Sequence, residues 1–133
     1  MTNVFRNVKC TALLASLAMS SAPGYATEFT PERICKAGIA AIMGRNPTSM
    51  RVTSNKSGVV SLYYIREDDG KKWSYKCRPE GQRIVWSADP GRWRNGPADE
   101  VIEYRNASDS IEVIQKFGDG SSSNEKFSGD SLK

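Results

Sequence analysis

The sequence of 133 residues contains no histidine. This removes the side chain that most often acts as a general base or a metal ligand near neutral pH. Ser123 and Lys126 have Ser-x-x-Lys spacing, but they lie in a serine-rich stretch rather than at the start of a helix. The acidic run 67–69 lacks the alternating ligands of a calcium loop. We therefore predict no catalytic residues, no metal site, no cofactor and no enzymatic activity. A small hydrolase that uses carboxylates is the least favoured function.

Also missing is an apolar run of about 20 residues, which a membrane-spanning helix would need. A shorter apolar run, 11–19, follows Arg6 and Lys9 and precedes the small residues around Ala26. This order is typical of a secretory signal peptide. We expect residues 1–26 to be a bacterial-type signal peptide that is cleaved near Ala26. The protein would then be periplasmic or secreted, without a transmembrane segment.

Neither sign of charge is in large excess. The chain has 19 basic and 15 acidic residues. Loss of residues 1–26 would remove Arg6 and Lys9 and no acid, which leaves 19 − 2 = 17 basic and 15 acidic residues. A net charge this close to zero does not indicate nucleic acid as a partner.

Cysteine is scarce, with three residues in the chain. Cys10 lies in the expected signal peptide, so Cys35 and Cys77 would remain after cleavage. Two cysteines in an oxidising compartment predict one disulfide. The alternative is a pair of separate reduced thiols in the core.

One helix is expected near the start of the exported chain. Thr30-Pro31-Glu32 supplies a capping side chain, a proline at the first helical position and an acid in the first turn. The helix should end near Met43, because Gly44 is a favoured stop. Cys35 falls on its apolar stripe. Small residues around Gly38 would let this helix lie close to a sheet.

Two successive β-hairpins are expected over residues 58–88. Asp69-Gly70 is a strong signal for a two-residue turn and would place Tyr64 opposite Tyr75. A second turn over 79–82 would place Cys77 opposite Ile84. Both registers gather the large side chains on one face, which supports them. That face would hold Val60, Leu62, Tyr64, Trp73, Tyr75, Cys77, Ile84 and Trp86.

Further strands are expected over 50–54, 100–105, 110–117 and 125–128, with a flexible loop at 118–124 and a frayed tail at 129–133. The predicted fold of residues 27–133 is therefore a single α+β domain. In it, one N-terminal helix packs on a curved antiparallel β-meander of five to seven strands, and one disulfide ties the helix to the central strand. The pattern leaves open whether the sheet closes into a barrel.

A loop over 89–97 is the first candidate binding site, because Arg92 and Arg94 flank Trp93 there. Tryptophan and arginine dominate binding hot spots, and an exposed indole can also stack on a sugar. The alternative is that Trp93 folds back to plug the open end of the sheet.

The outer face of the hairpins is the second candidate. The expected register places Arg78 opposite Arg83, with Lys76 and Tyr63 beside them. Such a mixture of cations and aromatic side chains is typical of protein interfaces. The alternative is an ordinary solvated face, or one covered by later strands.

The favoured hypothesis is thus an exported, non-enzymatic binding protein that docks a protein partner in the cell envelope, as an inhibitor or immunity protein does. The alternative is a structural or accessory envelope protein that binds a glycan or an anionic surface. The sequence indicates no oligomeric state.

Overall fold

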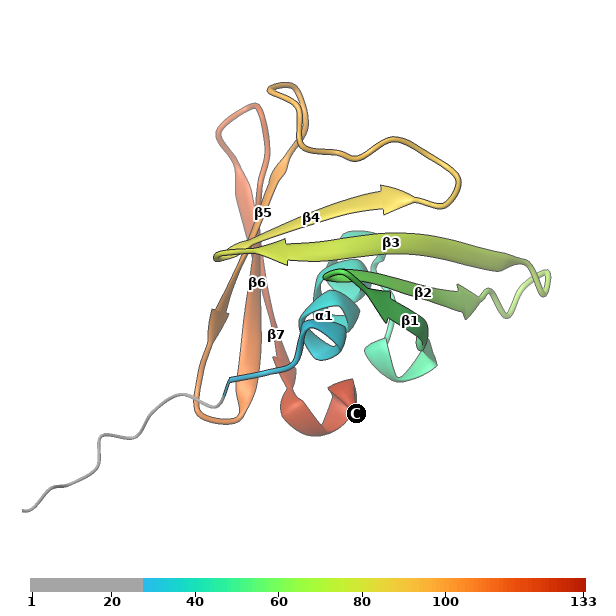
Figure 1. Ribbon diagram of the computed structural model, residues 1–133. Coiled ribbons are helices and arrows are strands. Elements are labelled where there is room, and N and C mark those ends of the chain that lie inside the picture. The colour runs from blue at the N-terminus through green and yellow to red at the C-terminus, as the bar shows by residue number, and fades with distance from the viewer. Residues whose placement is uncertain (1–27) are drawn as a thin grey trace, which may run out of the picture.

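The computed structural model describes residues 28–133, so the expected signal peptide lies outside the described residues. Within this range one α-helix accompanies a seven-stranded antiparallel sheet (Figure 1). This confirms the α+β class and the meander, although strands dominate. The elements are α1 (Pro31–Met43), the short 3₁₀ helix η1 (Pro47–Ser49), β1 (Arg51–Lys56), β2 (Val59–Ile65), β3 (Lys72–Glu80), β4 (Arg83–Ala88), β5 (Val101–Asn106), β6 (Ser110–Lys116), β7 (Ser122–Ser128) and the 3₁₀ helix η2 (Gly129–Leu132).

Both ends of α1 agree with the prediction. The Thr30 hydroxyl oxygen accepts a hydrogen bond from the Arg33 amide at 3.3 Å, which satisfies one of the free donors of the first turn. Gly44 ends the helix with a φ of 64°, and its amide donates to the carbonyl oxygen of Ala40. This left-handed conformation favours glycine.

The expected disulfide between Cys35 and Cys77 is confirmed. Their Cα atoms are 5.8 Å apart, and neither side chain is exposed to solvent. The bond joins α1 to β3, the third of the seven strands. It closes a loop between residues 42 positions apart in the sequence.

The seven strands follow one another in the sheet in sequence order. β1 and β7 are therefore its two edges, and the sheet is open in the described chain. β4 and β5 share a single cross-strand pair, Arg83 with Glu103. At this point the sheet bends sharply, and β5–β7 run at a steep angle to β1–β4 (Figure 1). α1 lies in the angle between the two parts.

The predicted hairpin registers were each wrong by two residues. Tyr75 faces Leu62 rather than Tyr64, and Cys77 faces Trp86 rather than Ile84. The cause is the position of each turn. A shift by two residues keeps every side chain on its expected face, so the inward set is preserved, although Trp73 at the start of β3 is 39% exposed.

The first turn is wider than expected. Arg66 and Lys71 close it through a hydrogen bond of 2.8 Å from the Arg66 amide to the Lys71 carbonyl oxygen, which leaves four residues in the loop. The Asp69 carboxylate accepts hydrogen bonds from the Arg66 side chain and from the Lys71 amide. The second turn consists of Gly81 and Gln82, because Glu80 and Arg83 already pair.

The last part of the chain forms more regular secondary structure than predicted. β7 begins at Ser122 and pairs with β6 along its whole length, so only the first part of the range 118–124 is a turn. The range 129–133 is also not a frayed end. It forms η2, and Leu132 is 1% exposed in the core.

The core lies between α1 and the inner face of the bent sheet. At Gly38 the helix approaches β4 so closely that an added Cβ would lie 2.8 Å from Ile84 Cδ1 and 3.1 Å from Ile84 Cγ2. The buried hydrophobic residues of this cluster are Phe29, Ile34, Cys35, Ala37, Ile39, Ala40, Ala41, Met50, Val60, Leu62, Tyr64, Tyr75, Cys77, Ile84, Trp86, Ile102, Ile111, Val113, Phe127 and Leu132.

Replacing both Cys35 and Cys77 with alanine should lower the free energy of unfolding by about 4 kcal/mol, because the unfolded chain regains the entropy that the closed loop had removed. Urea unfolding of the variant and of the oxidised wild type measures this difference. A loss below about 1 kcal/mol would contradict the structural role assigned to the bond.

Gly38→Ala should destabilise the fold by roughly 1 kcal/mol. Alanine gains about 1 kcal/mol in a helix interior, but crowding against Ile84 costs more. Ile84→Val removes the Cδ1 carbon in the closest contact, so the double variant should be more stable than the sum of the two single changes implies. Thermal unfolding of the wild type, the two single variants and the double variant completes this double-mutant cycle. Strictly additive effects would show that the close contact does not contribute to the cost of Gly38→Ala.

Candidate functional site

Trp93 brings together the two predicted binding sites, the loop 89–97 and the outer face of the hairpins. Lys76 and Arg78 point to the outer face of β3, because they alternate with the buried residues Tyr75 and Cys77. The centre of the Trp93 ring is 4.2 Å from Arg78 Cζ and 5.2 Å from Lys76 Nζ. The ring is half-buried and is not part of the core cluster. It therefore lies on the outside of the sheet rather than plugging its open end.

The loop after β4 brings Trp93 to this position. It turns back and runs along β4 (Figure 1), and the Arg94 amide donates a hydrogen bond of 2.8 Å to the Trp86 carbonyl oxygen. Val85 and Ser87 point outward from β4, yet they are 1% and 0% exposed. They face Arg78 and Lys76 across the hairpin, so the part of the outer face next to Trp93 is covered by this loop.

Arg92 holds the loop in shape. Its guanidinium donates two hydrogen bonds, of 2.9 and 2.7 Å, to the two carboxylate oxygens of Asp99, and the Gly96 amide donates a third at 2.9 Å. The Asp99 side chain is only 6% exposed. The Arg92 guanidinium, followed by the Gly96 amide, holds the pKa of Asp99 well below its usual range. We refer to this arrangement of Arg92, Gly96 and Asp99 as the loop clasp.

Arg94 has a different position from Trp93. Its guanidinium carbon lies 5.1 Å from the centre of the Trp86 ring, and Trp86 belongs to the inward set. The three residues that were predicted to act together are thus divided. Trp93 lies on the outer face, Arg92 forms the clasp and Arg94 covers Trp86.

The expected pairing of Arg78 with Arg83 was wrong, because the register is shifted by two residues. Val85 lies opposite Arg78, and Glu80 lies opposite Arg83. Arg78 forms an ion pair with Glu80 on its own strand. Arg83 also faces Glu103 at the bend of the sheet, so both of its cross-strand neighbours are acidic. No like-charge pair arises between these arginines.

Tyr63 lies on the same outer face and also contacts a cation. The Lys72 amine is 4.3 Å from the centre of its ring. The neighbouring Ile65 is 54% exposed. We call the group Tyr63, Lys72, Lys76, Arg78 and Trp93 the outer cationic surface. It presents two aromatic rings, each in contact with at least one cation of β3.

Sequence reasoning missed two members of this region. Lys72 was not chosen as a site residue, although its alternation with Trp73 already placed it on the outer face with Lys76. Asp99 was not chosen as a site residue either. Its spacing of seven residues from Arg92 follows no regular element, so no periodic pattern could reveal the clasp.

Among residues 28–133, no three histidine, cysteine, aspartate or glutamate side chains gather where they could hold a metal ion. No helix in that range has the length and apolar character needed to cross a membrane. Comparison with known proteins found no match, whether to protein-family models, to curated protein sequences or to solved structures.

Asp99→Asn should loosen the loop clasp without unfolding the sheet. The amide of Gly96 should then exchange its hydrogen faster, while amides of β2 and β3 keep their rates. Because the folded state lowers the pKa of Asp99, the clasp in the wild type is complete above the ordinary carboxyl pKa of about 4 and is lost as the pH falls through the lowered value.

Amide hydrogen exchange by NMR tests this expectation. Asp119→Asn is the matched control, because Asp119 also accepts a hydrogen bond from a loop amide, that of Ser121. If Asp99→Asn leaves the Gly96 rate unchanged, the clasp does not fix the loop.

Proposed function

We propose that this protein is an exported, non-enzymatic binding protein whose outer cationic surface docks an acidic surface of another cell-envelope protein. Action as an inhibitor or an immunity protein is one form of this function. The observation that carries the proposal is the position of Trp93, a half-buried ring that lies on the outside of the sheet against Lys76 and Arg78.

Preorganisation of the ring supports this proposal. Contacts between a cation and an indole contribute roughly 0.5–2 kcal/mol. They hold Trp93 in place from one side, and the loop clasp fixes its backbone on the other. A side chain that is already ordered loses less entropy on binding. Tryptophan, tyrosine and arginine are also the residues that most often carry the energy of a protein interface.

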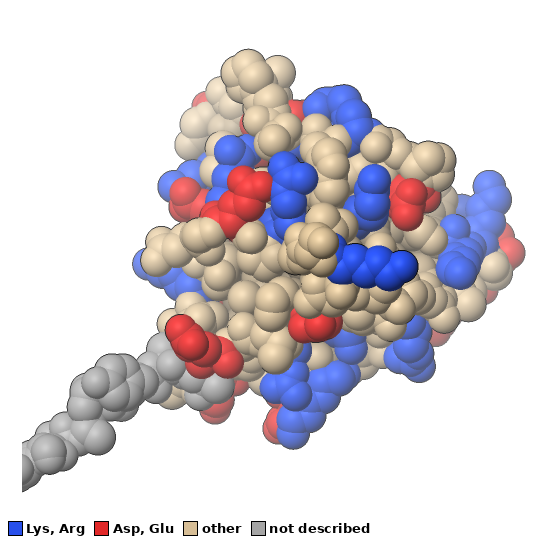
Figure 2. All heavy atoms as spheres, in the orientation of Figure 1, with Lys and Arg blue, Asp and Glu red and all other residues tan. Residues whose placement is uncertain are grey.

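The charge of the surface favours an acidic partner. Lys72, Lys76 and Arg78 extend along one face of β3, and Glu80 is the acid with which Arg78 pairs. Across the whole view in Figure 2, by contrast, acidic side chains lie among the basic ones. A local excess of cations beside an aromatic ring guides the approach of a carboxylate-rich protein surface.

Export is supported by the disulfide, since such bonds persist in oxidising compartments. The leader on which the periplasmic or secreted location depends lies outside the described residues.

A second candidate function is glycan binding at another place. A groove of about 380 Å³ is lined by Trp73, Tyr75, Trp86 and Pro90, and the exposed ring of Trp73 can stack on a sugar. This groove opens at the inner side of the sheet and does not include Trp93. Variants of Trp73 and Trp93 therefore separate the two functions.

Trp93→Ala should lower the affinity for the partner about thirtyfold or more, as expected for a hot-spot tryptophan, with little change in the melting temperature. A partner is first captured from an envelope extract and identified, and its affinity is then measured with purified proteins at several salt concentrations. The affinity should fall as salt rises, because exposed charges are screened.

Phe117→Ala is the matched control, because Phe117 is an exposed aromatic residue outside the surface. Equal affinity of the Trp93 variant and the wild type would refute docking at this surface. Loss of glycan retention in Trp73→Ala alone would favour the second candidate.

A further inference from the structure

A second cluster of cations lines a groove on another part of the molecule from the outer cationic surface. The groove has a volume of about 510 Å³ and lies between α1, β1 and η2. Arg33 and Lys36 from α1, Arg51 from β1 and Lys133 line it together with one acid, Glu32. None of these residues belongs to the outer cationic surface.

The charges of this cluster are poorly balanced within the groove. The Lys36 amine donates a hydrogen bond of 3.0 Å to the backbone oxygen of Lys133, and Arg51 donates one of 3.3 Å to the carbonyl oxygen of Thr48. These contacts hold the side chains in place, and neither of them involves the side chain of an acid. Lys133 forms an ion pair with an acidic side chain, that of Asp130, at 3.0 Å.

The cations also repel one another. Burial lowers the pKa of Lys36, and the positive charges of Arg51 and Arg33 lower it further. The carboxylate of Glu32 accepts a hydrogen bond of 2.9 Å from the side-chain amide of Asn55. A bound anion would relieve this repulsion, so the groove has an energetic reason to take one.

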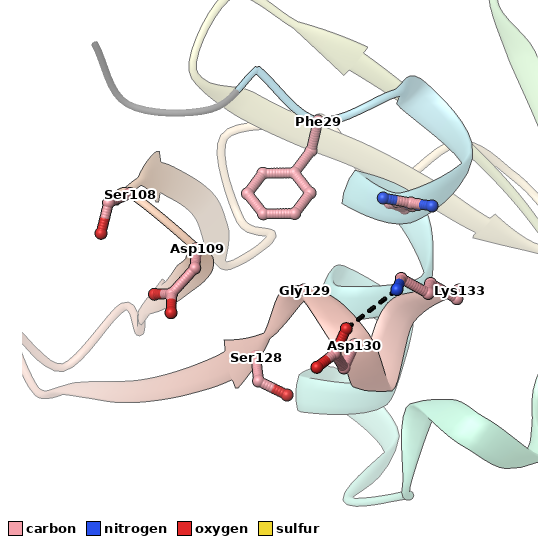
Figure 3. A pocket seen from close by; sticks show the side chains of 8 residues that line it. Phe29, Ser108, Asp109, Ser128, Gly129, Asp130 and Lys133 are labelled. Carbon is pink, nitrogen blue, oxygen red and sulfur yellow. Dashed lines mark ion pairs between the residues drawn. The ribbon is translucent and has the colours of Figure 1, made fainter. Parts of the chain in front are cut away.

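Arg33 and Lys133 also line an adjoining cavity, where two aspartates balance their charges. This cavity, of about 230 Å³, is lined by Phe29, Asp109 and Asp130 among others. Figure 3 shows the Lys133 amine turned towards Asp130, with the Phe29 ring on the other side of the space. Basic side chains also gather at the lower edge of Figure 2, where η2 lies in Figure 1.

We propose that the groove between α1, β1 and η2 binds a phosphate-bearing ligand. A guanidinium offers two parallel donors that match phosphate oxygens, and an ammonium adds a point charge. With four cationic side chains and one acidic side chain in the lining, a phosphate monoester of about two negative charges is attracted more strongly than a single carboxylate. The volume lies within the roughly 300–1,000 Å³ of small-molecule sites, so the phosphate can carry a sugar or a glycerol group.

Asp130 competes with this ligand for Lys133. The pair is exposed at both ends, with 65% of the Lys133 side chain and 89% of the Asp130 side chain accessible. Exposed pairs contribute little stability, so a phosphate can displace the carboxylate. Removing the carboxylate should therefore strengthen phosphate binding, which is the opposite of what truncation of a ligand contact does.

The test is isothermal titration calorimetry of the full chain, in its oxidised form, with inorganic phosphate and with glycerol 3-phosphate at constant ionic strength. The double variant Arg33→Gln and Arg51→Gln should bind about tenfold more weakly or worse. Asp130→Asn should bind about two- to fivefold more tightly, since it removes a competing charge. Lys56→Gln, an exposed cation of β1 outside the lining, should change the affinity by less than about twofold.

Vesicles distinguish the source of the phosphate. Binding to phosphatidylcholine vesicles that contain phosphatidic acid, lost in the double variant, assigns the groove to a lipid headgroup. Binding of glycerol 3-phosphate alone assigns it to a soluble ester. Both outcomes support the proposal.

Absence of binding to phosphate, to glycerol 3-phosphate and to these vesicles overturns the proposal, as does an equal loss of affinity in Lys56→Gln. Should the double variant fail to fold, the shift in the wild-type melting temperature with phosphate, relative to chloride at equal ionic strength, decides instead. A shift that is larger in Asp130→Asn supports the site, and no shift refutes it. Both results test the groove independently of the outer cationic surface, because they do not involve Trp93.

Discussion

The covalent link between α1 and β3 is the constraint on which the rest of the structure depends. It brings a helix of small residues against the inner face of the sheet, so closely that Gly38 touches Ile84. A domain of this size buries a modest share of its surface, and the cross-link compensates for part of that deficit. The helix fills the angle of the bent sheet, and Trp93 lies outside the core that it forms there.

The bend of the sheet determines where Trp93 goes instead. β5 leaves β4 after one cross-strand pair, which exposes the edge of β4 to the loop that follows it. That loop bonds to Trp86 and covers Val85 and Ser87 from outside. The loop clasp then fixes the segment so that its tryptophan meets two cations of β3. The outer cationic surface thus depends on two features of the fold: α1 packs against the inner face of the sheet, and the sheet bends between β4 and β5.

Local patterns in the sequence were sufficient for the helix, its caps, the disulfide and the inward face of the hairpins. Asp69-Gly70 located the first hairpin but not its loop length, because the Asp69 carboxylate stabilises a wider loop through Arg66 and Lys71. The error of two residues preserved the face and misplaced the pairs, which is why Arg78 does not face Arg83. The serine-rich start of β7 was taken for a flexible loop, since pairing with β6 comes from the backbone and leaves no apolar alternation there. The bend, the clasp and the position of Trp93 arise from contacts between distant residues, which no local pattern encodes.

The most direct test of the central claim, that α1 fills the inside and leaves Trp93 on the outside, is a nuclear Overhauser measurement on the oxidised protein. The account predicts cross-peaks from the Trp93 indole protons to the side-chain protons of Lys76 and Arg78, whose charged groups lie within 5.2 Å of the ring centre. Cross-peaks from the Trp93 indole to Ile39 or Leu62, which belong to the core under the helix, would contradict it.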